Sequence, residues 1–142
     1  TQGTIEIEAS PSEIMEVIAD FDAYPEWVDG ITAAETRERG EDGRPIVVAF
    51  EFSAMGFNAA YTLTYEYRPD DAGVRWTTVE ATGAVKDVQG GYELEPLNGD
   101  TRVTYRLAVD LAVKVPGFLK RQGDKRAIKT ALDGLKSRVE SA

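Results

Sequence analysis

Between residues 31 and 111, apolar and polar side chains alternate along one segment after another, and turn motifs separate several of these segments. Alternation with a period of two residues is typical of strands that bury one face. The turn motifs include residues 40–43 (GEDG), residues 69–73 (PDDAG) and the Asn98-Gly99 pair, which hold the residues that tight turns favour. Because short turns join neighbouring antiparallel strands, this region predicts one meandering antiparallel sheet.

Helical patterns flank this region on both sides. Ser10, Pro11 and Glu13 form a helix-start signal, in which the serine caps the helix and the glutamate reaches back to the cap. Apolar residues recur at helical spacing in the last part of the chain, so residues 117–141 are predicted to form one long amphipathic helix. We predict strands at residues 4–9, 31–39, 46–52, 59–67, 74–80, 84–95 and 103–111.

These elements predict an α+β fold in a single domain, residues 1–142. A sheet with one apolar face needs a partner layer, and only the C-terminal helix is long enough to supply it. We therefore expect a curved antiparallel sheet of about seven strands wrapped around that helix, with two short helices after the first strand. A helix cannot fill a concave sheet completely, so space for a cavity is expected between the layers.

The chain contains no histidine and no cysteine, which limits its chemistry. Disulfides, thiolate nucleophiles and zinc sites built from Cys and His are excluded, and so is the usual neutral-pH proton shuttle. The acidic pairs Glu41-Asp42 and Asp70-Asp71 lie in turns and lack the spacing of a calcium loop. We predict no metal site and no cofactor, and any catalysis would use carboxylates, tyrosine or lysine.

The net charge of −9 is unevenly distributed and argues against nucleic acid as a partner. Residues 1–71 hold 16 acidic and 4 basic side chains, whereas residues 116–142 hold 7 basic and 3 acidic ones. The basic C-terminal helix is either a solvated face or a docking face for an anionic membrane or an acidic partner, through Lys125, Lys129 and Lys136. The oligomeric state stays open. We expect a cytoplasmic protein, although a short leader removed before Thr1 is compatible with the sequence.

Residues 20–31 (DFDAYPEWVDGI) concentrate aromatic and acidic side chains between the first helix and the sheet. Pro25 and Glu26 suit the first turn of a short helix. Tyr24 and Trp27 are interpreted in two ways: as a packed corner of the core, or as a gate at the mouth of a cavity.

The order of elements and three motifs carry a resemblance to a known family. The motifs are YPEW (residues 24–27), VQGGYELEP (residues 88–96) and GDTRVTYRL (residues 99–107). With them, nearly the whole chain resembles the START-like polyketide cyclase/dehydrase and lipid-transport superfamily (SRPBCC), near the small bacterial cyclase/dehydrase-like and coenzyme-Q-binding proteins. The resemblance implies a helix-grip fold with a deep apolar cavity between the sheet and the long helix.

Large side chains with polar ends share the predicted inner face of the sheet. In a solid core each buried hydroxyl or indole N–H needs a partner, whereas in a cavity it meets water or a ligand. Either they fill a core or they line a pocket, with the Met55–Phe57 loop over its mouth and Phe118 and Leu119 closing the other side. The predicted ligand-binding residues are Phe50, Phe52, Met55, Tyr61, Leu63, Trp76, Thr78, Tyr92, Tyr105 and Phe118.

Glu80 is the candidate catalytic residue. By strand alternation it shares the face of Trp76 and Thr78, and a carboxylate in an apolar cavity has a raised pKa and can act as an acid. The alternative is that Glu80 lies in solvent near the strand end at Gly83. Two functions follow: a carrier or binding protein for a lipid, isoprenoid quinone or polyketide-like molecule, or a cyclase, aromatase or dehydratase that uses the same cavity.

Overall fold

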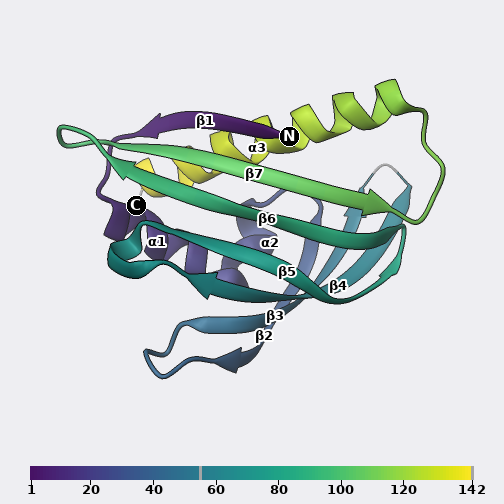
Figure 1. Ribbon diagram of the computed structural model, residues 1–142, viewed down its shortest axis with the longest axis horizontal. Helices are drawn as coiled ribbons and strands as arrows, with labels where there is room; N and C mark the ends of the chain where they lie inside the picture. Colours follow the sequence, from purple (N-terminus) through teal and green to yellow (C-terminus); the bar gives the residue numbers. More distant parts are fainter. Residues whose placement is uncertain (55, 142) are drawn as a thin grey trace.

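The computed structural model describes residues 1–54 and 56–141 of the chain. Strands and helices follow one another with short connections, and two of these connections contain 3-10 turns, η1 and η2 (Figure 1). In chain order the elements are β1 (Gln2–Ile7), α1 (Pro11–Ala19), η1 (Phe21–Ala23), α2 (Tyr24–Trp27), β2 (Ile31–Arg39), β3 (Pro45–Ala54), β4 (Phe57–Tyr67), η2 (Pro69–Asp71), β5 (Gly73–Gly83), β6 (Val85–Pro96), β7 (Thr101–Leu111) and α3 (Gly117–Glu140).

The strands form one antiparallel sheet in the order β1-β7-β6-β5-β4-β3-β2. Strands β2 to β7 are neighbours in sequence and in space, whereas β1 pairs with β7, so that Gln2 lies opposite Arg106. The helices lie on one face of this curved sheet (Figure 1). The predicted α+β class, with a curved seven-stranded sheet, two short helices after β1 and a long C-terminal helix, is confirmed.

Helix α1 begins as the sequence predicts and ends earlier. The Ser10 hydroxyl accepts a hydrogen bond from the Glu13 amide at 3.2 Å, and the Glu13 carboxylate accepts one from the Ser10 amide at 3.3 Å. These two bonds satisfy donors that a helix start leaves free. Ile14, Val17, Ile18 and Phe21 recur at helical spacing in the sequence, a pattern that predicts a helix reaching Phe21. The helix instead ends at Ala19, and Phe21 begins η1 with its ring buried.

Helix α3 packs against the sheet with its C-terminal half. Gly3 of β1 allows the helix to come close, because a Cβ atom built at Gly3 would lie 2.5 Å from Cγ2 of Ile128. Residues 117–127 form the other half, and none of them is buried. No helix in the described part of the chain combines the length and the apolar character that a membrane span requires. The buried residues of α3 are Ile128, Leu132, Leu135 and Val139.

Strand β5 carries a bulge at Val79. Leu63 of β4 lies opposite Thr78, but the preceding residue of β4, Thr62, lies opposite Glu80, so Val79 is an extra residue without a partner in the register. One inserted residue reverses the alternation of the residues beyond it. Beyond Val79, the side chains of β5 that plain alternation would turn toward the helices therefore face away from them, and the others face the helices.

Candidate ligand-binding face

The concave face of the sheet carries a continuous row of aromatic rings that crosses neighbouring strands. Tyr65 of β4 lies with its ring centre 5.8 Å from that of Trp76 on β5, and the Trp76 ring centre is 5.5 Å from that of Tyr92 on β6. Tyr92 and Tyr105 of β7 are stacked at 4.7 Å. Tyr61 of β4 extends the set through Phe50 of β3, at 5.6 Å.

The polar ends of these rings have no partner within the described residues. Two other tyrosines do: the Tyr24 hydroxyl donates to the Ile18 carbonyl at 2.5 Å, and the Tyr67 hydroxyl donates to the Pro45 carbonyl at 2.6 Å. No side-chain nitrogen or oxygen in the described part of the chain is both fully enclosed and unpaired. The unpaired groups therefore border space that a water-sized molecule can reach. They are the hydroxyls of Tyr61, Tyr65, Tyr92 and Tyr105 and the indole N–H of Trp76.

Burial keeps these phenols in their neutral form. Desolvation raises the pKa of Tyr61 to about 12, and it raises the pKa values of Tyr65, Tyr92 and Tyr105 further above the ordinary value for tyrosine. All four hydroxyls are therefore protonated at neutral pH and are hydrogen-bond donors. Tyr61 and Tyr105 are also partly exposed, which places their rings at the border between the core and open space.

The concave face is closed at one end and open at the other. The C-terminal half of α3 covers one end with buried Leu132 and Leu135. Beside the exposed first half of α3, a hollow of about 390 Å³ lies between that helix and strands β6 and β7. Its lining includes Leu107 and Val109 of β7 and Lys120 of α3. The lining of this hollow contains none of the concave-face tyrosines.

Most of the predicted ligand-binding residues lie on the concave face. Leu63 lies opposite Val48 and Phe50 opposite Tyr61 in the register of β3 and β4, and all four are buried or partly buried. Phe118 instead lies at the first turn of α3 and is 58% exposed. Met55 lies outside the described residues. The predicted residues brought together on this face are Phe50, Phe52, Tyr61, Leu63, Trp76, Thr78, Tyr92 and Tyr105.

Thr78 is on this face, but its hydroxyl serves the sheet. The backbone pairing of β5 with β6 ends at Trp76 and Gly90. Beyond that point the Thr78 hydroxyl accepts a hydrogen bond from the Val88 amide at 2.7 Å and donates one to the Val88 carbonyl at 2.9 Å. This side chain therefore joins the two strands where their backbones part, and its hydroxyl is not free for a ligand.

The inward placement that alternation predicts for Glu80 is wrong. Because of the bulge at Val79, Glu80 lies opposite Thr62, whose neighbours Tyr61 and Leu63 face inward. Glu80 therefore faces away from the helices, and it is exposed. The alternative that Glu80 lies in solvent is correct, although the cause is the bulge and not the strand end at Gly83.

The open end has apolar lining that was not among the predicted site residues. The bulge turns Ala81 inward opposite Tyr61, and no local signal marks this change. Leu107, Val109 and Leu111 continue the inner face of β7, and Val85 of β6 lies opposite Leu111. The alternation in β7 predicts that Leu107, Val109 and Leu111 share the inner face. Their partial exposure could not be predicted, because it depends on which end of the sheet α3 leaves uncovered.

The corner at residues 20–31 packs against the core. Tyr24 lies between the rings of Phe21 and Trp27, with ring centres 5.0 and 5.1 Å away. Gly134 in the C-terminal half of α3 borders Trp27, where an added Cβ atom would be 3.5 Å from the indole ring. These contacts are at the covered end of the sheet. They support packing as the role of Tyr24 and Trp27.

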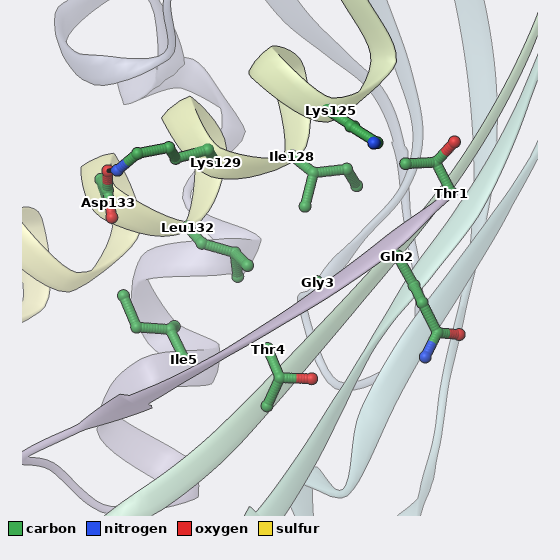
Figure 2. Close-up of a pocket in the computed structure, with 10 residues that line it drawn as sticks. All are labelled: Thr1, Gln2, Gly3, Thr4, Ile5, Lys125, Ile128, Lys129, Leu132 and Asp133. Atoms are coloured by element: carbon green, nitrogen blue, oxygen red, sulfur yellow. Dashed lines mark hydrogen bonds and ion pairs between the residues drawn. The ribbon is translucent and has the colours of Figure 1, made fainter. Parts of the chain in front are cut away.

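A second hollow, of about 320 Å³, lies between β1 and α3 (Figure 2). Ile128 and Leu132 point toward β1, and Lys129 forms an ion pair with Asp133 at 2.7 Å (Figure 2). Next to this hollow, Lys136 donates to the Glu6 carbonyl at 2.8 Å and so covers part of the free edge of β1. The hollow is at the edge of the sheet, and its lining contains none of the concave-face tyrosines.

Comparison with known proteins identifies the family. Residues 1–140 match the family model described as polyketide cyclase/dehydrase and lipid transport. The chain belongs to this family. The resemblance noted in the sequence is thereby confirmed, and it covers nearly the whole chain. A search of curated proteins found no match.

Solved structures of this superfamily share the fold. A START superfamily protein from Mycobacterium smegmatis is 22% identical with a TM-score of 0.88, covering 99% of this chain and 97% of that one. The Zhui aromatase/cyclase from Streptomyces sp. R1128 is 16% identical with a TM-score of 0.81, covering 99% and 92%. A STAR-related lipid transfer protein from Xanthomonas axonopodis is 20% identical with a TM-score of 0.78, covering 98% and 84%.

Proposed function

We propose that this protein binds an apolar small molecule that carries hydrogen-bond acceptors, on the concave face between the sheet and α3. The observation that carries the proposal is the set of donors without protein partners. Tyr61, Tyr65, Tyr92, Tyr105 and Trp76 each present a polar end within an apolar surround. A few convergent polar groups in an apolar site are what small-molecule pockets use to fix orientation.

The donors favour one class of apolar ligand over another. A neutral phenol or indole N–H donates a hydrogen bond to a carbonyl oxygen, and it gains nothing from a saturated hydrocarbon. Burial of the ligand's apolar surface would supply most of the affinity, at about 25 cal/mol per Å² before the costs of ordering. Quinones, polyketide-like molecules and lipids with oxygen near the buried end fit this requirement better than plain acyl chains.

The role that we propose is carriage or binding. A proton acceptor would be needed for cyclisation or dehydration, and Glu80, the carboxylate nominated from the sequence, lies on the outer face. The tyrosines are neutral donors and poor bases at neutral pH, as phenols ordinarily are, and burial raises their pKa values further. The likeness to an aromatase/cyclase and to a lipid transfer protein concerns the fold alone. The enzymatic alternative would use the same face, with the tyrosines as its candidate catalytic residues.

Native mass spectrometry of the purified protein, followed by organic extraction, tests for a natural ligand. A co-purifying molecule near one-to-one, with oxygen in its structure, would identify the ligand class. A matched pair of probes tests the chemistry directly: 9-fluorenone and fluorene share a carbon frame and differ by one carbonyl. In equilibrium dialysis we expect 9-fluorenone to bind more tightly than fluorene, and Tyr92→Phe with Tyr105→Phe to remove that preference. Equal binding of both probes would contradict the proposed role of the tyrosines.

A further inference from the structure

Exposed apolar side chains gather at the open end of the molecule. Of the five large apolar residues that are strongly exposed in the described chain, Val79 lies at the bulge of β5 and the other four lie at the start of β4, after β7 or at the start of α3. They are Phe57 (43%), Val113 (39%), Phe118 (58%) and Leu119 (46%). We call these four residues the apolar tip. Side chains of this size are normally covered, and their gathering at one place marks an interaction surface.

Backbone hydrogen bonds show that the parts of the apolar tip are neighbours. The Ala84 amide in the β5–β6 turn donates to the Asn58 carbonyl at 3.0 Å, next to Phe57. The Ala112 amide, next to Val113, donates to the Ala84 carbonyl at 2.8 Å. Helix α3 begins a few residues later, at the same end of the sheet (Figure 1). Three connections that are distant in sequence therefore meet beside the open end of the concave face.

Positive charge surrounds the apolar tip. Residues 112–126 contain five basic side chains and one acidic one, in a chain whose net charge is −9. Lys120 pairs with Asp124 at 2.8 Å. Within the described residues, the other four have no ion-pair partner, and all four are exposed. They are Lys114, Arg121, Lys125 and Arg126.

The rest of the basic helix differs in this respect. Lys129 pairs with Asp133 at 2.7 Å, and Lys136 pairs with Glu140 at 2.8 Å. Of the three lysines that the sequence indicated as a docking face, only Lys125 is free of an ion pair among the described residues. The available positive charge is therefore concentrated at the start of α3 and not along its whole length.

The start of α3 adds a further attraction for anions. Pro116 precedes the helix and supplies no capping side chain, and its carbonyl accepts from the Leu119 and Lys120 amides. The free N–H groups at a helix start carry partial positive charge. This uncapped helix start carries Phe118 and Leu119 of the apolar tip, so apolar side chains, cationic side chains and backbone donors occur together at the start of α3.

We propose that the apolar tip and the basic segment 112–126 dock the protein onto an anionic lipid bilayer. Apolar side chains ringed by basic ones suit the boundary between acyl chains and anionic headgroups. Residues 1–111 hold 22 acidic and 8 basic side chains, so repulsion would turn the remainder of the protein away from the membrane. Docking itself does not require the concave-face ligand. That the open end would then exchange a ligand with the bilayer rests on the proposed function.

Sedimentation with lipid vesicles tests the docking. The protein would be mixed with vesicles of phosphatidylcholine alone or with about 30% phosphatidylserine, a fraction chosen to give the strongly anionic surface that attracts basic segments. We expect at least tenfold stronger binding to the anionic vesicles, and loss of that binding in high salt because screening shortens the reach of the charges. Equal binding to both vesicle types, or none to either, would overturn the proposal and leave a protein partner as the occupant of the apolar tip.

Matched variants locate the surface. Arg121→Glu with Lys125→Glu should weaken binding to anionic vesicles at least tenfold, and Phe118→Ser with Leu119→Ser should do the same. Arg37→Glu with Arg75→Glu makes the same change in net charge on exposed residues of β2 and β5 and should change binding less than twofold. An equal loss in both charge variants would refute a specific surface. Binding of 9-fluorenone to the Arg121→Glu, Lys125→Glu variant should be unchanged, which separates a failure of docking from a failure of ligand binding.

Discussion

Removing single tyrosine hydroxyls should separate the two kinds of tyrosine in this protein. In Tyr24→Phe the Ile18 carbonyl loses the donor that lies 2.5 Å away. A net hydrogen bond contributes about 0.5–1.5 kcal/mol, and a carbonyl left without a partner costs more, so we expect a loss of about 1–2 kcal/mol. In Tyr105→Phe the hydroxyl that is removed has no partner among the described residues. The expected change in the free energy of unfolding is therefore below about 0.5 kcal/mol.

Thermal and urea unfolding followed by circular dichroism measure this difference. For a chain of this length, a loss of 1 kcal/mol lowers Tm by about 3 °C, so Tyr24→Phe should unfold about 3–6 °C earlier than the wild type while Tyr105→Phe stays close to it. Tyr67→Phe is a second control with a bonded hydroxyl, at 2.6 Å from the Pro45 carbonyl. If Tyr105→Phe and Tyr92→Phe destabilise the protein as much as Tyr24→Phe, their hydroxyls have partners, and the argument for an open polar face fails.

Two further predictions concern titration and packing. The folded pKa of Tyr61 is raised to about 12, above its unfolded value near 10. Its contribution to stability is therefore complete below pH 10 and is lost as the pH rises toward 12. Absorbance at 295 nm should show tyrosinate forming late and together with unfolding, and early titration of every tyrosine would disprove this. In urea unfolding, Gly3→Ala should lower the free energy of unfolding by about 1–3 kcal/mol, because the added carbon overpacks against Ile128. Gly123→Ala is the control, since nothing lies within 4 Å of its added carbon. It should leave the free energy of unfolding unchanged or raise it by up to about 1 kcal/mol.

The sequence predicts the concave face well, because alternation alone decides which side chains of a regular strand share a side. Tyr61, Leu63 and Tyr65 face the helices as their spacing predicts. The same reasoning fails at Glu80, since one unpaired residue at Val79 reverses the sides and no neighbouring residue announces it. The helix start at Ser10 was predictable for a different reason: its bonds connect residues three apart in the chain.

The sequence could not predict which hydroxyl groups of the concave face are hydrogen-bonded within the protein. Whether a tyrosine hydroxyl is bonded depends on which backbone carbonyl lies beside it after folding, and nothing in the sequence near Tyr24 or Tyr105 shows this. Likewise, Thr78 appeared to be a candidate ligand contact, but its position where β5 and β6 part commits its hydroxyl to Val88. The resemblance to the family predicted the fold and the general kind of ligand, and it carried no information on these individual contacts.

The bulge at Val79 also decides which face of the sheet carries Glu80. Without the bulge, Val79 would take the place opposite Thr62 and each later residue of β5 would move on by one. Glu80 would then enter the interior opposite Tyr61, and Ala81 would leave it. A carboxylate would then stand among neutral phenols, in surroundings that raise its pKa. One step of register at the end of a single strand therefore separates an inner surface that has only hydrogen-bond donors from one that has an acid–base group.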